Sequence, residues 1–326
     1  MADDPEFSIQ KIAHAITRDV DTTQSYDVAT LDEHVYTCIS LSRSPFDSGK
    51  LAGYTEVEMT HIWNFIEGMR HSHKSIRKLL KGEQSASAVD ALTIARLQIE
   101  NLFTICFLLQ SPENVRLFLK NAWKKKYVRF LLHRAEHVHL SRFDEYFNVT
   151  GLEMIDKLQG ECFVSDQERH TIDFQQLGTP SGQPPQLVRI EGFPGPAAVV
   201  KKVINLDQQR MLARLNSEYE FLCSFAHGDA EAVVTRTLAD TRSPFHRFLT
   251  TSAIEKHYQE HVLEPPILYS ALSSILVATE VAAVFPDQVE LRARLGLAWE
   301  FLTKSSLLTV SAWEIRAKKV LGVLGI

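Results

Sequence analysis

Apolar side chains recur along most of this chain at intervals of three and four residues, the spacing of one face of an α-helix. The first such stretch, 55–82, ends at a glycine. The second, 85–110, becomes apolar on nearly all sides toward its end, which is typical of a central helix. Further helices are predicted over 112 to about 147, about 150–168, 207–225, 267–285 and 288–320. The pattern predicts an all-α, multi-helix bundle.

Turn-forming residues agree with this fold class. The chain has only 14 glycines and 12 prolines among its 326 residues, too few for a sandwich or barrel of many short strands. Ser111 and Pro112 separate the second helix from the third, because serine caps a helix N-terminus well and proline fits the first helical turn.

Two parts of the chain lack a clear helical pattern. Residues 1–54 are expected to be an N-terminal extension, partly irregular, ahead of a helical bundle domain over 55–326. An irregular insertion is expected at about 170–205, where the segment LGTPSGQPPQ at 177–186 predicts a loop or hinge. A short β-hairpin is allowed around Gly192 to Pro196, although the prolines there disfavour strands.

The stretch 267–285 is the one transmembrane candidate in the sequence. A membrane-spanning helix needs about 20 predominantly apolar residues. This stretch contains five polar residues: Ser270, Ser273, Ser274, Thr279 and Glu280. A buried core helix is therefore expected, with no membrane partner.

Charge and cysteine usage narrow the function classes. Thirty-five Lys and Arg against 40 Asp and Glu give a formal charge of -5, so a contact with nucleic acid would require a local basic patch. The four cysteines form no CxxC pair and predict reduced thiols rather than disulfides. The acidic N-terminus has no apolar signal-peptide core. We expect a cytoplasmic protein.

Metal-binding patterns occur but lack the further ligands that a site would need. His133, Glu136 and His137 fit H-x-x-E-H, as do His257, Glu260 and His261, and this spacing suits a zinc hydrolase. Glu58 and His61 resemble half of a di-iron site. Solvated helix faces explain all of these patterns, so no metal and no cofactor is expected; a metal-dependent hydrolase remains the third functional alternative.

Common enzyme signatures are absent from the sequence. It contains no nucleophile elbow, no P-loop and no dinucleotide-binding glycine pattern. One segment does carry candidate binding chemistry, because it interleaves basic residues with Trp123 and Tyr127. Its basic members are Lys120, Lys124, Lys125, Lys126, Arg129 and Arg134. Such a segment fits RNA phosphates and stacked bases, or is simply a solvated helix face.

Two motifs give the chain a resemblance to a known family. Arg96 and Glu100 form an Arg-x-x-x-Glu helix followed by an apolar run, and 219–228 resembles a Tyr-x-x-Leu-Ser-x-x-x-His-Gly signature, with Cys223 inserted before the serine. In these features the chain resembles bacterial helical domains of unknown function that are related to the HEPN (higher eukaryotes and prokaryotes nucleotide-binding) superfamily.

The resemblance implies an activity on RNA. HEPN domains that cut RNA carry an Arg-x(4–6)-His motif, but no arginine precedes His227 at that spacing, and the match from Arg134 to His139 has alanine where a polar residue is usual. If the chain is an enzyme, we expect a metal-independent ribonuclease. His227 would be the acid–base group, Arg96 would stabilise phosphate and Glu100 would orient the site. A structural polar network is the alternative role for these residues.

The sequence thus favours a HEPN-like helical domain that binds or cleaves RNA, with a role in bacterial defence or stress response implied by the resemblance alone. Homodimers are expected because relatives often dimerise. The main alternative is a non-enzymatic module that docks a protein partner. That alternative requires Arg96, Glu100 and His227 to be buried and to satisfy one another, whereas a nuclease requires a groove that reaches His227.

Overall fold

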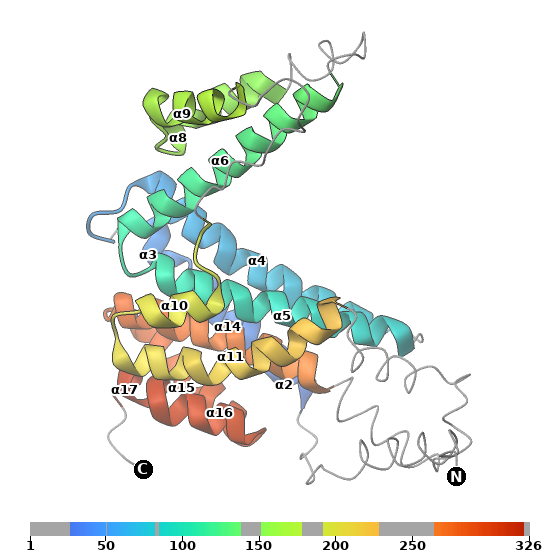
Figure 1. The fold of residues 1–326 in the computed structure, drawn as a ribbon. Helices are drawn as coiled ribbons and strands as arrows, with labels where there is room; N and C mark the ends of the chain where they lie inside the picture. Colours follow the sequence, from blue (N-terminus) through green and yellow to red (C-terminus); the bar gives the residue numbers. More distant parts are fainter. Residues whose placement is uncertain are drawn as a thin grey trace, which may run out of the picture. The chain divides into compact units, whose positions relative to one another are not determined.

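The computed structural model describes residues 27–49, 51–81, 85–137, 151–177, 192–227 and 264–322 (Figure 1). The described residues are mostly helical and include no β-strand, so the all-α prediction is confirmed. Two compact units are distinguished: unit 1 comprises 1–110 with 195–326, and unit 2 comprises 111–194.

Unit 1 contains most of the helices predicted from the apolar spacing. Their bounds are α2 Val28–Leu41, α3 Ser44–Asp47, α4 Glu56–Leu80, α5 Ser85–Leu108, α10 Pro196–Lys202, α11 Leu206–His227, α14 Glu264–Val284, α15 Val289–Leu302, α16 Leu307–Ala312, the π-helix η4 Trp313–Ala317 and α17 Lys318–Leu321. The segment predicted as one helix from 288 to 320 is interrupted after α15. Ser306 and Thr309 form a reciprocal capping box there that begins α16.

Helix α14 lies at the centre of unit 1, where it packs against α5, α4, α2 and α15. All of its side chains from 270 to 282 are buried. Two of its polar side chains have partners inside the bundle: Thr279 accepts a hydrogen bond from Trp299 Nε1 (3.0 Å), and Glu280 binds Arg316. By length and composition, α14 and also Asp90–Leu108 of α5 could each cross a membrane, so the prediction that 267–285 is the one candidate was wrong. The rest of the molecule covers most of both stretches.

The N-terminal segment contributes to this core. Leu31, Val35, Cys38 and Ile39 follow an i, i+4, i+7, i+8 spacing, and all four are fully buried. Helix α2 packs on α15 and α14. The described part of the expected extension is therefore largely helical and integral to unit 1.

The described part of unit 2 contains α6 Pro112–His137, α8 Glu153–Glu161 and α9 Asp166–Leu177. Its core comprises Trp123, Tyr127, Val128, Phe130, Ile155, Val164 and Ile172. The helix expected over 150–168 is divided, because Phe163 adopts a positive φ of 60° and Ser165 begins α9. Ser165 and Glu168 cap each other through hydrogen bonds of 3.1 and 3.2 Å.

The hairpin allowed around Gly192 to Pro196 does not form in the described residues. Residues 192–195 have no regular secondary structure, and Pro196 begins α10, where its fixed φ suits the first helical turn. No residue from 192 to 205 pairs as a strand. Within the described ranges, the irregular part of the expected insertion is therefore confined to short connections.

Candidate functional site at the contact of α5 and α11

Helix α11 presents a core-facing stripe that becomes polar for one turn. The Asn205 side chain accepts hydrogen bonds from the amides of Asp207 and Gln208 (3.1 and 3.0 Å) and so begins the helix. Leu215 and Leu222 are buried one turn before and one turn after Tyr219. Because residues three and four apart share a helix face, Tyr219 is placed toward α5, on which α11 packs.

Arg96 of α5 meets Tyr219 at this contact. Arg96 Nη2 donates to the Tyr219 hydroxyl (2.9 Å) and lies 3.3 Å from Glu100 Oε2, and Arg96 Nε donates to Cys223 Sγ (3.2 Å). The guanidinium carbon is 5.1 Å from the centre of the Tyr219 ring. The two motifs behind the family resemblance therefore touch each other, and they do so through one arginine, which is 18% exposed.

The electrostatics of this cluster favour stable charges over proton transfer. Burial alone would lower the pKa of Arg96, but its bonds to Cys223, Tyr219 and Glu100 outweigh burial and raise it. Burial and the neighbouring Cys223 and Glu100 raise the pKa of Tyr219 above its usual value. A phenol with a raised pKa is a poor acid–base catalyst near pH 7. The cluster therefore holds a charged guanidinium in a fixed orientation, and Tyr219 is poorly suited to transfer protons.

His227 lies apart from this cluster. It is the last residue of α11 and is exposed, eight residues beyond Tyr219, or about 12 Å along the helix axis. The hydrogen bonds and ion pairs of Arg96 go to Glu100, Tyr219 and Cys223. Within the described ranges, the structure brings together Arg96 and Glu100 as expected but does not join His227 to them.

The predicted RNA-binding residues lie on α6 and divide into two groups. Lys124 Nζ lies 2.8 Å from Glu168 Oε1 of α9, and Lys120 binds the same carboxylate at 3.1 Å. Lys125, Arg129 and Arg134 are exposed, and Lys126 is exposed with its Nζ 3.3 Å from Met154 Sδ. Lys124 is therefore occupied inside unit 2. Lys125, Lys126 and Arg129 form the exposed basic face of α6, and Arg134 is exposed farther along the helix, on another side.

The aromatic part of this prediction requires a correction. Trp123 and Tyr127 are 2% and 3% exposed and stack on each other with ring centres 4.9 Å apart. Trp123 Nε1 also donates to the Ile155 carbonyl at 2.8 Å. These rings form the core of unit 2 and are not available to stack on bases.

The metal-binding patterns find little support in the part of the chain that the structure describes. No group of three or more His, Cys, Asp or Glu side chains there lies close enough to hold a metal ion. Glu58 is buried, and its carboxylate accepts the Thr55 amide hydrogen bond (2.7 Å) that caps α4. His257, Glu260, His261 and His139 lie outside the described residues, as do the side chains of Glu136 and His137.

One buried polar network was not predicted from the sequence. His73 is fully buried; it donates from Nε2 to Asp32 (3.0 Å), and its Nδ1 lies 2.8 Å from Ser270 Oγ. Burial alone would raise the pKa of Asp32, but hydrogen bonds from His73 and Arg77 lower it. Asp32, His73 and Ser270 lie on α2, α4 and α14, so no local motif joins them. His73 and Ser270 are buried, so their contact joins α4 to α14 inside the bundle, whereas Asp32 is partly exposed.

Comparison with family models, with curated proteins and with solved structures finds no match to this chain.

Proposed function

We propose that this chain is a HEPN-like helical protein that binds RNA through the exposed basic face of α6. The single observation that carries the proposal is the exposure of Lys125 and Arg129 on this face. Lys125 and Arg129 are separated by one helical turn and therefore share a face. Cations on such a ridge bind successive phosphates and displace counterions, whichever bases the strand contains.

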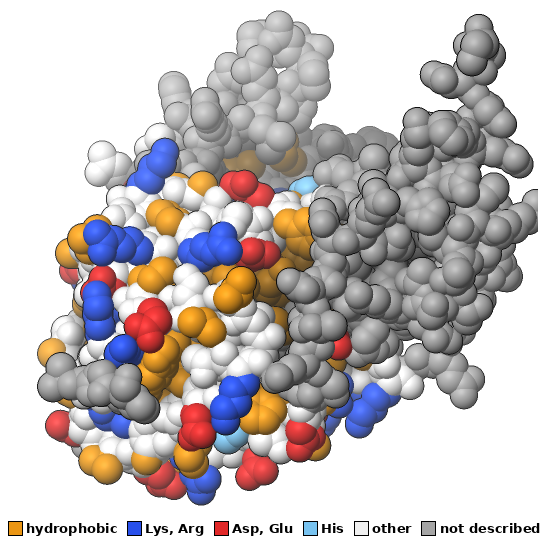
Figure 2. Space-filling view, turned by 90° about the horizontal axis from the view of Figure 1, so that it is seen from below, with side chains coloured by type: hydrophobic (Ala, Val, Ile, Leu, Met, Phe, Trp, Pro, Cys, Tyr) orange, Lys and Arg blue, Asp and Glu red, His pale blue; other side chains and the backbone are white. Residues whose placement is uncertain are grey.

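A local site suits the overall charge of the protein. The formal charge is -5, and the side of the molecule seen in Figure 2 intersperses basic, acidic and apolar side chains, with no large area of one sign among the described residues. RNA attracted to α6 would therefore bind weakly and with a strong dependence on salt, because phosphate contacts supply most of the free energy.

The arrangement around Arg96 argues against cleavage of RNA at that site. Glu100 neutralises the guanidinium that a nuclease would aim at phosphate, and the raised pKa of Tyr219 makes its hydroxyl a weaker acid. His227 is too far along α11 to act together with Tyr219. In this proposal the α5–α11 cluster holds two helices together, and α6 carries the RNA contact.

The test measures binding of a fluorescent single-stranded RNA by anisotropy at low salt and at 0.15 M salt. Lys125→Glu combined with Arg129→Glu should weaken binding roughly tenfold or more and flatten the salt dependence. The matched control, Lys74→Glu with Lys78→Glu, reverses two exposed lysines at the same spacing on α4 and should leave the affinity nearly unchanged. Absence of binding by the unmodified chain, or equal losses in both double variants, contradicts the proposal.

Incubation of the same RNA with protein and EDTA tests the catalytic alternative. We expect no cleavage. Metal-independent cutting that disappears in His227→Ala would instead identify a ribonuclease in which His227 is the acid–base group.

The protein-docking alternative retains one supporting observation. It requires Arg96 and Glu100 to satisfy each other, and they form an ion pair of 3.3 Å, although His227 is exposed rather than buried. If anisotropy shows no binding of RNA by the unmodified chain, this alternative becomes the better account of the molecule.

A further inference from the structure

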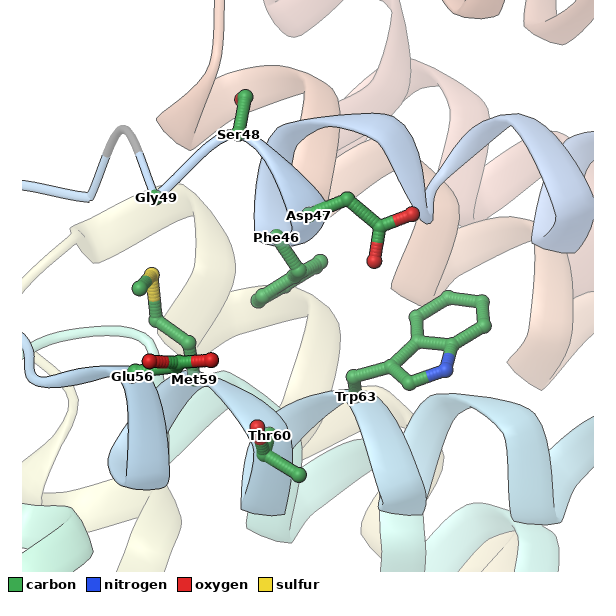
Figure 3. A pocket seen from close by; sticks show the side chains of 8 residues that line it. All are labelled: Phe46, Asp47, Ser48, Gly49, Glu56, Met59, Thr60 and Trp63. Atoms are coloured by element: carbon green, nitrogen blue, oxygen red, sulfur yellow. The ribbon is translucent and has the colours of Figure 1, made fainter.

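A pocket of about 460 Å³ lies between α3 and the first turns of α4, in unit 1. Figure 3 shows side chains from both segments around it, with Asp47 on the α3 side and Glu56, Met59, Thr60 and Trp63 along α4. None of these residues belongs to a site predicted from the sequence. The pocket lies in a different unit from the basic face of α6, so its role is independent of the proposed function.

Aromatic rings make one wall of this pocket rigid. Phe46 is 7% exposed, and its ring packs against Trp63 (centres 6.2 Å apart) and edge-on against Phe285 of the core (5.6 Å). Trp63 is only partly buried, so part of its indole is accessible to a ligand. The electron-rich face of an indole attracts cations more strongly than the face of any other side chain.

The protein itself already places a cation against this ring. The guanidinium carbon of Arg43 lies 5.8 Å from the centre of the Trp63 ring, and Arg43 Nε binds Asp47 Oδ2 at 3.0 Å. An aromatic face and a carboxylate thus hold one guanidinium from the side of α3. The arrangement shows which chemical group these two side chains accommodate.

The pocket has a second carboxylate, which has no ion-pair partner among the described residues. Glu56 is exposed, and it forms no ion pair with any residue that the structure describes. Asp47 and Glu56 together carry two negative charges, and Arg43 compensates one of them. A ligand that enters from solvent therefore meets an aromatic face with an uncompensated negative charge nearby.

We propose that this pocket binds a guanidinium or alkylammonium group, with the cation held by the Glu56 carboxylate and the Trp63 ring and its apolar stem against Met59. A small organic cation fits the volume and both chemical features. An anion would be repelled by the two carboxylates. A bare metal ion would lack ligands, since no cluster of three ligating side chains occurs in the described part of the chain.

The experiment uses the full chain labelled with 5-fluorotryptophan, whose four ¹⁹F signals belong to Trp63, Trp123, Trp299 and Trp313. Trp63→Phe assigns the Trp63 signal by its loss. Butylguanidinium should shift that signal saturably, with a dissociation constant on the order of 1 mM, as for a small ligand held by one ion pair and one ring. The other three signals should not move. The isosteric neutral probe, butylurea, should bind at least about tenfold more weakly.

Two variants test the contacts. Glu56→Gln should weaken butylguanidinium binding roughly fivefold, whereas the control Glu290→Gln, an exposed acid in the first turn of α15, should not change it. Thr60→Arg places a competing cation one turn from Glu56 and should abolish the shift, and an arginine at an exposed helical site is compatible with folding. Equal binding of butylurea, shifts of all four signals together, or unchanged affinity in both pocket variants would overturn the proposal.

A second arm separates a free small cation from the side chain of a peptide. Acetyl-Gly-Arg-Gly-amide is compared with the same peptide containing neutral citrulline in place of arginine. Tighter binding of the arginine peptide than of butylguanidinium identifies a peptide as the source of the cation. Binding of butylguanidinium alone identifies a free small cation. Failure of both cationic probes overturns the proposal.

Discussion

Arg316 binds both carboxylate oxygens of Glu280 in the core of unit 1, through hydrogen bonds of 2.7 and 2.8 Å. Gln208 donates a third hydrogen bond to the same carboxylate (2.7 Å). The three residues come from η4, α14 and α11, and Glu280 is 2% exposed. The partners offset the free energy that it costs to bury this carboxylate. Loss of one partner leaves the buried charge poorly compensated and destabilises the folded state.

Arg316→Leu should therefore destabilise unit 1 strongly. The substitution leaves the Glu280 carboxylate buried and paired only with Gln208, and the free energy of unfolding should fall by about 3 kcal/mol. Urea denaturation, monitored by circular dichroism, measures this decrease in the free energy of unfolding.

The double variant Arg316→Leu, Glu280→Met is the control. It removes both charges and should recover most of the lost stability, because an apolar pair of similar volume needs no partner. A double variant less stable than the single one would show that packing rather than unpaired charge dominates at this position.

Glu168 should make the stability of unit 2 depend on pH. Burial alone would raise its pKa, but hydrogen bonds from Lys124, the Ser165 amide and Lys120 lower it from 4.5 to about 2. Because the pKa of Glu168 is lower in the folded state, its carboxylate stabilises the folded state. This contribution to the free energy of unfolding is complete above pH 4.5 and is lost as the pH falls toward 2.

The measurement compares the chain with its Glu168→Gln variant. Trp123 is the one tryptophan in unit 2, so its ¹⁹F signal reports unfolding of that unit. The original chain should be the more stable at pH 6, and the difference should shrink as the pH is lowered from 4.5 to 2. A difference that stays constant with pH would exclude the carboxylate as its source.

Cysteine accessibility should separate two pairs of thiols. All four cysteines are free; Cys38 and Cys106 are buried, whereas Cys162 and Cys223 are partly exposed. Burial raises the pKa of Cys38 to about 12 and that of Cys106 well above its usual value, and only the thiolate reacts with alkylating reagents. Iodoacetamide at pH 8 should therefore modify Cys38 and Cys106 only after unfolding, as mass spectrometry of peptides would show. Rapid labelling of Cys106 in the native protein would contradict the described core.

Tyr219→Phe should weaken the α5–α11 contact moderately. It removes the hydroxyl that accepts from Arg96 Nη2 but keeps the ring, so the free energy of unfolding should fall by about 1 kcal/mol. Chemical denaturation measures the change. For comparison, Tyr54→Phe removes a tyrosine hydroxyl that donates to the Leu108 carbonyl (2.8 Å) and lies outside this cluster. RNA affinity should be unaffected by Tyr219→Phe, since the proposed contact lies on α6.

The helices were predictable because burial imposes its period on the sequence. Leu31, Val35 and Cys38 mark the limit of that signal: they follow the helical spacing, but the short segment around them has too weak a pattern to separate α2 from an irregular extension. The division between α8 and α9 was missed, although Ser165 and Glu168 stand at the spacing of a capping box that could have predicted it.

The candidate site was predictable only in part. Arg96 and Glu100 are one helical turn apart, so their ion pair follows from the sequence. Whether Tyr219 or His227 contacts Arg96 depends on the axial position at which α11 packs on α5. No local sequence pattern determines that position. The burial of Trp123 and Tyr127 was missed for a related reason: basic neighbours made the segment look exposed on all sides, whereas one face of α6 packs on α8 and α9.

The polar side chains of α14 also restrict how the bundle can assemble. Ser270 meets His73 of α4, and ten residues later, about 15 Å along the axis, Glu280 meets Arg316. A slide by one residue would rotate the helix by about 100° and separate both pairs at once. A uniformly apolar helix could pack at several axial positions with similar energy. Helix α14, in contrast, has one axial position at which Ser270 and Glu280 both contact their partners. The uniqueness of the native arrangement thus rests on a few polar atoms in an otherwise apolar interior.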